Sequence, residues 1–231
     1  RDTGGDENFR IYAVDTRTGE ERNLTPFDKV RANFVASSWK HPDNYLIGLN
    51  NRDPRWHDVW NVNIVTGERE LVAENPGFRN YYADRDLNLR LAVQPQSDGS
   101  NRVLKREKSG EWAEFFRIPR ADALTTSPVG FLEGGEKFYM IDSRNRNTAG
   151  LFLVDFETGE QELIAESEKA DVSSVLTDPE TGSALAYSIN YLKESWQVLD
   201  PSVERDLKTL QSRFPDGFSV IDQTRDNQTW M

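Results

Sequence analysis

The sequence predicts an all-β protein of the β-propeller type, in which four-stranded antiparallel sheets follow one another along the chain. Three observations lead to this fold class: a strand–turn–strand unit recurs, its turn glycine returns at regular intervals, and several strands are apolar on both faces. Four strands in about 45 residues is the repeat of a propeller blade. The 231 residues therefore supply about five blades' worth of strands.

The recurring unit is an apolar strand, a turn that closes on Thr-Gly-Glu, and a more polar strand. Its clearest copies are residues 11–20, 59–68 and 151–160, and residues 103–116 are a degenerate copy. The glycine supplies the positive φ that such hairpin turns require. Successive turn glycines are 48, 43 and 49 residues apart. They are Gly19, Gly67, Gly110 and Gly159.

In chain order, the pattern predicts half a blade, three full blades and the start of a fifth. Their ranges are 9–25, 31–76, 77–120, 123–167 and from about 170 onward. Further strands are expected between the hairpins at 45–50, 87–93 and 137–142. In the fifth blade, we expect a hairpin over 172–189 and a third strand over 196–199.

Some of these strands do not alternate between apolar and polar residues. Residues 138–141 and 151–154 are apolar throughout, so both of their faces must be covered, as neighbouring blades would cover them. The polar strands that follow the Thr-Gly-Glu turns suit a half-exposed outer position. A β-sandwich whose turns are alike by coincidence is the alternative fold.

One short helix is predicted near residues 201–214. Asp200 is a suitable N-cap residue, and Pro201 suits the first helical position. The apolar residues that would share one face of this helix are Val203, Leu207, Leu210 and Phe214. We expect this face to pack on a blade and favour that interpretation over a partner-binding helix. A strand at 218–224 is expected next, and it could complete a blade with the N-terminal half blade.

Composition excludes several classes of function. The chain has no cysteine, which rules out disulfides, thiolate metal sites and a cysteine nucleophile. Its net charge of −11 disfavours binding to nucleic acid and to anionic membrane surfaces. No apolar run approaches the ~20 residues that span a bilayer. The compartment stays open between cytoplasm and periplasm.

No catalytic constellation is evident in the sequence. It lacks a Gly-x-Ser-x-Gly nucleophile elbow and a glycine-rich phosphate loop. Its two histidines are His41, in a turn before Pro42, and His57, expected to precede a strand; both are interpreted as surface or turn residues. We therefore expect no catalytic, cofactor-binding or metal-binding residue.

Three weaker motifs have structural interpretations. Asp84, Asp86 and Asn88 resemble the start of a calcium loop, but Leu89 and Pro95 stand where glycine and glutamate are needed, so a β-turn is predicted. Residues 52–58 are charged and aromatic, and they are either a rim loop that contacts a partner or, as we favour, a solvated turn. Glycosylation triplets at 23–25 and 227–229 are short and common patterns.

A series of segments, taken in order, resembles the prolyl oligopeptidase (S9) family of serine peptidases. The segments are residues 5–15, 23–27, 40–43, 48–54, 71–78, 84–87 and 141–144. The similarity is closest to bacterial acylaminoacyl-peptidase-like and dipeptidyl-aminopeptidase-like members. It implies a seven-bladed propeller placed over an α/β-hydrolase domain with a Ser-Asp-His triad.

The resemblance implies that residues 1–231 are a single propeller domain from the middle of such a propeller, without the hydrolase domain. No triad residue can then be assigned. The expected function is a non-catalytic cap that restricts the hydrolase active site to short peptides. Its partners would be the C-terminal hydrolase domain and, indirectly, peptide substrates.

Two other functions stay open from the sequence. A stand-alone propeller could be a scaffold for protein–protein interaction. A propeller enzyme with a central metal, such as a lactonase, would need carboxylates, Asn or His converging on the axis, and the sequence defines no such set.

Overall fold

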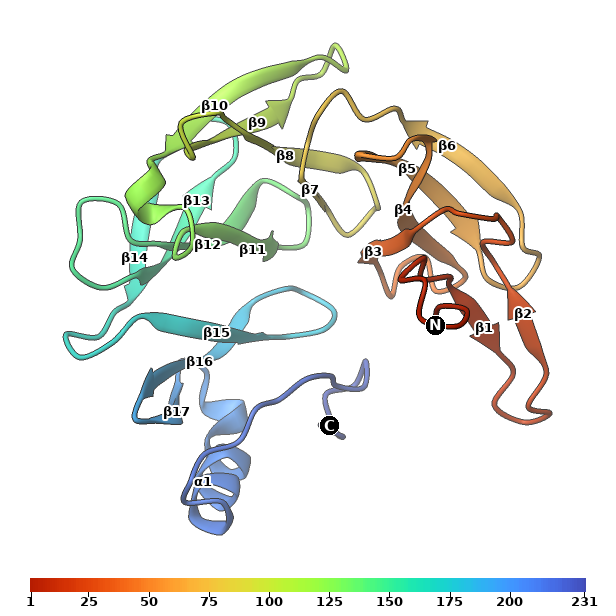
Figure 1. The fold of residues 1–231 in the computed structure, drawn as a ribbon. Coiled ribbons are helices and arrows are strands. Elements are labelled where there is room, and N and C mark those ends of the chain that lie inside the picture. The colour runs from red at the N-terminus through yellow and green to blue at the C-terminus, as the bar shows by residue number, and fades with distance from the viewer. The chain divides into compact units, whose positions relative to one another are not determined.

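A computed structural model describes all of residues 1–231 and confirms the predicted class, with seventeen β-strands and one α-helix (Figure 1). The chain divides into two compact units. Residues 1–95 with 103–114 form the N-terminal unit, and residues 96–102 with 115–231 form the C-terminal unit. Each unit is built from antiparallel sheets of consecutive strands, which is the construction of propeller blades.

The N-terminal unit begins with a two-stranded sheet, β1 (Tyr12–Val14) and β2 (Glu21–Asn23). A four-stranded sheet follows in the order β3-β4-β5-β6. Its strands are β3 (Ala32–Ser37), β4 (Asn44–Asp53), β5 (Trp56–Asn63) and β6 (Arg69–Ala73). The next sheet has the order β10-β9-β8-β7. Its strands are β7 (Asn80–Ala83), β8 (Leu89–Pro95), β9 (Asn101–Arg106) and β10 (Trp112–Ile118), and the units divide within β9 and β10.

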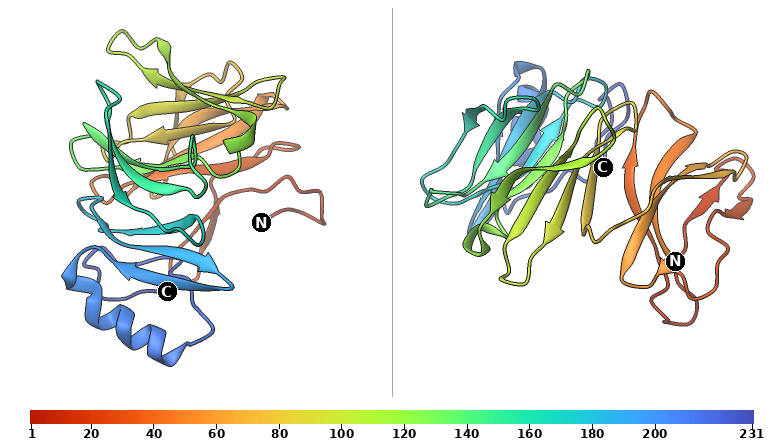
Figure 2. Two further views of the ribbon diagram at one scale, coloured as in Figure 1. Left: turned by 90° about the vertical axis from the view of Figure 1, so that its left-hand side faces the viewer. Right: turned by 90° about the horizontal axis from the view of Figure 1, so that it is seen from above.

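The C-terminal unit contains a four-stranded and a three-stranded sheet, in the orders β11-β12-β13-β14 and β15-β16-β17. The first has β11 (Ser127–Phe131), β12 (Lys137–Asp142), β13 (Gly150–Asp155) and β14 (Gln161–Ala165). The second has β15 (Val172–Thr177), β16 (Ala184–Tyr191) and β17 (Lys193–Val198). A 3₁₀ turn, Pro201–Val203, leads into α1 (Glu204–Arg213), which lies beside this sheet (Figure 2). A second 3₁₀ turn is Arg120–Asp122.

Apolar clusters on both faces of a sheet explain why its strands do not alternate. In β4, Leu46 packs into the cluster shared with β7 and β8, whereas the next residue, Ile47, packs into the cluster that contains Ala13 of β1 and Leu24. Both side chains are almost completely buried. In β12, Phe138 meets Phe131 and other rings, while Tyr139 joins the cluster that reaches β15. These strands are covered on both sides, as predicted.

The Thr-Gly turns are stabilised by an Asp or Asn four residues before the glycine. Asp155 Oδ1 accepts hydrogen bonds from the backbone N–H groups of Glu157 and Thr158, at 3.0 and 2.8 Å. Gly159 then adopts a φ of +76°. Side-chain acceptance of this kind is a known reason for Asp and Asn in turns. The same arrangement recurs at Asp15, Asn63 and Asp178.

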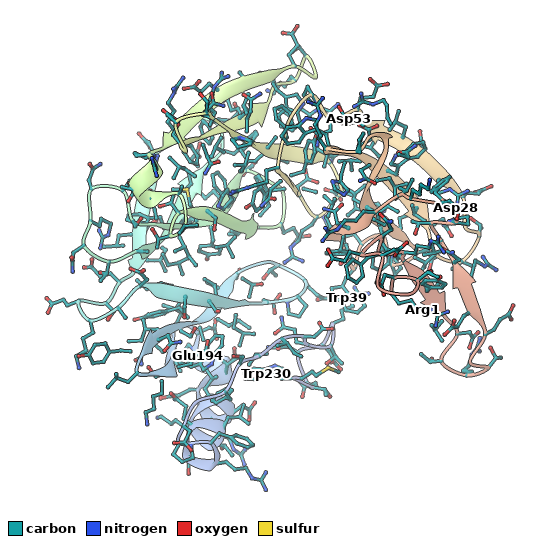
Figure 3. All side chains as sticks on the ribbon, viewed as in Figure 1. Arg1, Asp28, Trp39, Asp53, Glu194 and Trp230 are labelled. Atoms are coloured by element: carbon teal, nitrogen blue, oxygen red, sulfur yellow. The ribbon has the colours of Figure 1, made fainter.

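Two predicted strands require correction. β8 begins at Leu89 instead of residue 87, because Leu87 takes a φ of +62° in the preceding turn. Residues 218–224 do not form a strand; they make one isolated bridge, Gln223 to Trp230. This segment is held instead by side chains of β17, since Trp196 Nε1 donates to the Phe218 carbonyl and Glu194, which is labelled in Figure 3, accepts from Ser219. The hypothesis of a joint blade with the N-terminal strands stays a prediction.

The predicted helix is present and begins as expected. Asp200 accepts the backbone N–H of Ser202 at 2.8 Å, and Pro201 opens the first turn. Val203 and Leu207 are buried against β16 and β17, which confirms packing on the sheet. Phe214 is 48% exposed at the end of the predicted face. No helix of the structure is both long and apolar enough to span a bilayer.

Candidate functional site

A cavity of about 210 Å³ lies within the N-terminal unit. Its walls come from β3, the middle of β4, the start of β5, the segment after β6, and β7. Most of the lining side chains are polar, and Phe34 of β3 adds an apolar aromatic ring. The residues on which its chemistry depends are Asn33, Phe34, His57, Arg79, Tyr81 and Tyr82.

Gly48 makes room for the polar wall of this cavity. It lies opposite Asn33 in the β3–β4 register. A Cβ atom at Gly48 would lie 2.0 Å from Asn33 Oδ1 and 3.0 Å from His57 Cβ. Because glycine has no side chain, the Asn33 amide occupies the space over β4 and next to His57.

A buried polar network next to the cavity joins β5 to the segment before β7. Arg52 donates to Asp58 through Nε at 2.8 Å and Nη2 at 2.7 Å, and the Asp58 side chain is only 3% exposed. Asp58 also accepts the Asn75 backbone N–H at 2.7 Å. Asn75 Nδ2 donates to the carbonyls of His57 and Phe78, so β5 is tied to the segment that enters β7. This network holds His57 on one wall and the start of β7 on the other.

Two residues that line the cavity each have a buried polar atom without a hydrogen-bond partner, namely His57 Nε2 and Tyr81 Oη. Burial lowers the pKa of His57 below its usual value, and the charge of Arg31 lowers it further, while Asp58 opposes the shift. Burial also raises the pKa of the Tyr81 phenol, and Asp58 adds to that effect. At neutral pH these two groups are therefore uncharged hydrogen-bonding groups.

Tyr82 and Arg79 complete the electrostatics of the lining. Burial raises the pKa of Tyr82, so its phenol also stays protonated. Arg79 is exposed and makes no ion pair with a carboxylate. No Asp or Glu is among the residues that line the cavity. The cavity therefore presents one positive charge and several neutral hydrogen-bonding groups.

The structure corrects the interpretation of His57 and gives the predicted turn at residues 52–58 its place in the fold. His57 lies inside β5, which begins at Trp56, and it is half-buried in the cavity wall. Residues 52–58 are the β4–β5 hairpin turn and the strand ends beside it; Asp53, labelled in Figure 3, pairs with Arg55 at the exposed tip, whereas Asp58 is buried. The run of charged residues gave no sign of strand ends in the sequence. In the structure these charges pair with one another within the hairpin.

The structure agrees with the turn interpretations of His41 and of Asp84, and it also places the two glycosylation triplets. His41 lies in the turn between β3 and β4, with Nε2 3.9 Å from Asp86 Oδ1. Asp84 forms a β-turn, in which Oδ1 accepts the backbone N–H groups of Asp86 and Asn88. In the glycosylation triplets, Asn23 Oδ1 accepts the Thr25 N–H, and Asn227 Oδ1 accepts from Trp230.

Sequence reasoning missed most of the cavity. Arg79, Tyr81 and Asn33 belong to no motif, and they meet only because β3 and β7 lie side by side. One signal was available: Gly48 interrupts an apolar strand, and an isolated glycine there indicates a close approach by another group. No group of three or more His, Asp or Glu side chains is placed to hold a metal ion.

Consecutive antiparallel sheets, three of them four-stranded, with apolar clusters on both faces of the β3–β6 and β11–β14 sheets, define the chain as part of a β-propeller. No protein-family model matches it. Among curated proteins it is 43% identical over 232 residues to dipeptidyl aminopeptidase BIII of Pseudoxanthomonas mexicana, covering all of this chain and 34% of that relative. It is 27% identical over 248 residues to dipeptidyl peptidase family member 6 of Caenorhabditis elegans, covering 33% of it. The chain thus spans about a third of these relatives' length.

Solved structures show the same fold at low sequence identity. A putative TolB from Agrobacterium tumefaciens matches 84% of this chain with a TM-score of 0.56 at 12% identity, over 71% of its own length. The acylaminoacyl peptidase of Pyrococcus horikoshii matches 83% of this chain with a TM-score of 0.51 at 15% identity, over 33% of its length. The chain is therefore similar in sequence to one third of a dipeptidyl aminopeptidase, and its fold is that of the propeller in solved structures of larger peptidases.

Proposed function

We propose that this chain is the non-catalytic propeller of an S9-type serine peptidase. The observation that carries the proposal is the 43% identity along the whole chain to one third of a dipeptidyl aminopeptidase. In the proposal, residues 1–231 form one propeller domain that contributes no catalytic, cofactor-binding or metal-binding residue. The chemistry belongs to an α/β-hydrolase domain of the same protein.

The proposed role of the propeller is to cover the hydrolase active site and restrict it to short peptides. Both curated relatives are named for dipeptide release, which supports peptides as the substrate class. A rigid cover acts by size: a folded protein cannot reach a nucleophile beneath it, whereas an extended peptide of a few residues can. Doubly covered sheets supply the rigidity that such a cover needs.

The test compares this chain with the longer protein encoded by its gene. We expect a Gly-x-Ser-x-Gly motif downstream, no hydrolysis by residues 1–231 alone, and hydrolysis of dipeptidyl p-nitroanilides by the longer protein. Turnover by the longer protein should fall steeply as unlabelled peptides lengthen. A gene without a hydrolase domain would overturn the proposal in favour of a scaffold, and equal cleavage of short peptides and folded proteins would overturn the covering role.

A further inference from the structure

The lining of the N-terminal cavity has a charge opposite to that of the molecule. The chain has 39 acidic and 28 basic residues, yet the cavity wall contains the positively charged Arg79, the neutral His57 and no carboxylate. Arg31 adds positive potential at His57. The nearby Asp58 is already paired with Arg52 through two hydrogen bonds. The cavity is therefore suited to an anion.

We propose that this cavity binds the C-terminal carboxylate of a short peptide. The guanidinium of Arg79 would hold the carboxylate, because its planar fork matches the two oxygens and no protein carboxylate competes for it. The Asn33 amide, placed beside His57 by Gly48, would donate a further hydrogen bond. That the carboxylate belongs to a peptide rests on the proposed function; the anion site itself does not.

Two buried polar groups without hydrogen-bond partners support the binding of a polar ligand in this cavity. Tyr81 is only 9% exposed, and its hydroxyl is buried without a partner, as is His57 Nε2. A buried polar atom without a hydrogen bond costs about 1–3 kcal/mol, and native proteins rarely leave one unexplained. Both residues line the same cavity, and both can donate to a carboxylate oxygen.

The size and the apolar part of the wall limit the ligand. A volume of about 210 Å³ is smaller than the ~300–1,000 Å³ of pockets for drug-sized molecules. It suits one terminal residue with its carboxylate and not a long segment. Phe34 and Val35 of β3 also line the cavity, and Phe34 is 59% exposed. These side chains favour an apolar residue at the peptide's C-terminus.

The test is calorimetric titration of the 231-residue chain with Ala-Phe, its C-terminal amide, and Ala-Glu-amide. We expect Ala-Phe to bind at least tenfold more tightly than either amide. Arg79→Gln should weaken Ala-Phe binding at least tenfold, and Arg79→Lys should recover part of it. Arg213→Gln, which removes an exposed charge at the end of α1, is the matched control and should bind like the parent. Far-ultraviolet circular dichroism checks that all variants are folded.

Several results would overturn the inference. Equal binding of the acid and the amide, or binding that survives Arg79→Gln, would exclude a carboxylate site at Arg79. Tight binding of Ala-Glu-amide would assign the carboxylate to a side chain, and equal binding of acetate would reduce the site to one for any small anion. None of these measurements uses the hydrolase activity, so failure here is distinct from failure of the proposed function.

Discussion

Two arginine–aspartate pairs lie in the β4–β5 hairpin and differ in burial. The side chains of Arg52 and Asp58 are 43% and 3% exposed, whereas those of Arg55 and Asp53 are 77% and 22% exposed. Only Asp58 also accepts a buried backbone N–H, that of Asn75. Removing a buried partner leaves the remaining groups unsatisfied, whereas an exposed pair is replaced by water.

We expect Asp58→Ala to lower the free energy of unfolding by about 2–4 kcal/mol, because Arg52 and the Asn75 N–H both lose their acceptor. Urea denaturation followed by tryptophan fluorescence measures this change. Asp53→Ala is the control from the same hairpin and should have a clearly smaller effect. Similar losses in the two variants would show that the Asp58 network does not stabilise this unit.

His57 makes stability depend on pH in a defined direction. Its pKa in the folded chain lies below the usual value near 6.5, so the unfolded chain binds a proton more readily. The stabilisation is present above pH 6.5 and decreases as the pH falls from there through the folded pKa. His57→Gln should flatten this part of the stability–pH profile, measured as the urea midpoint between pH 7 and 5.

The other histidine supplies the control for that profile. His41 is exposed in a turn, and His41→Gln should keep the pH dependence of the parent chain. If both variants follow the parent curve, burial of His57 does not affect stability.

The location of His57 could not be predicted from its neighbours in the sequence, because Arg52, Asp53 and Arg55 gave the segment the composition of a solvated turn.

At the scale of elements, the turn glycines have the same backbone conformation but different surroundings. Gly19 and Gly159 have φ values of +75° and +76°. A Cβ atom at Gly19 would meet nothing within 4 Å, whereas at Gly159 it would lie 3.2 Å from the Phe115 ring. The two positions therefore separate the strain of the turn from its packing.

Gly19→Ala should cost about 1–2 kcal/mol from the left-handed conformation alone, and Gly159→Ala should cost more because the Phe115 ring must move. Thermal or urea unfolding of both variants checks this order. A larger loss of stability in Gly19→Ala than in Gly159→Ala would contradict this order.

The four-stranded sheets and their turns were predictable because hairpin geometry depends on neighbouring residues, as the Asp155 turn illustrates.

The C-terminal segment shows where local patterns fail. Residues 218–224 have the composition of a strand, but Trp196 and Glu194 bind this segment through their side chains. Whether an extended segment joins a sheet depends on a free strand edge beside it, which composition does not reveal. The helix before it was predictable because Asp200, Pro201 and the apolar spacing are local signals.

At the scale of the whole molecule, the single-domain assignment of residues 1–231 predicts cooperative unfolding. Differential scanning calorimetry should show one transition, with a calorimetric enthalpy equal to the van't Hoff enthalpy. The chain contains two compact units, and these could instead unfold in two separate transitions. Two resolved transitions would show that the units are separate domains.

The sequence by itself determined the blade repeat, the turn glycines and the resemblance to S9 peptidases. These depend on short-range geometry and on a residue order that extends along the whole chain. Only the tertiary structure decided which polar residues meet. Asn33, Gly48, His57 and Arg79 belong to different parts of the N-terminal unit, and their approach depends on the packing of β3 against β7. A cavity is a property of that packing, which no local pattern contains.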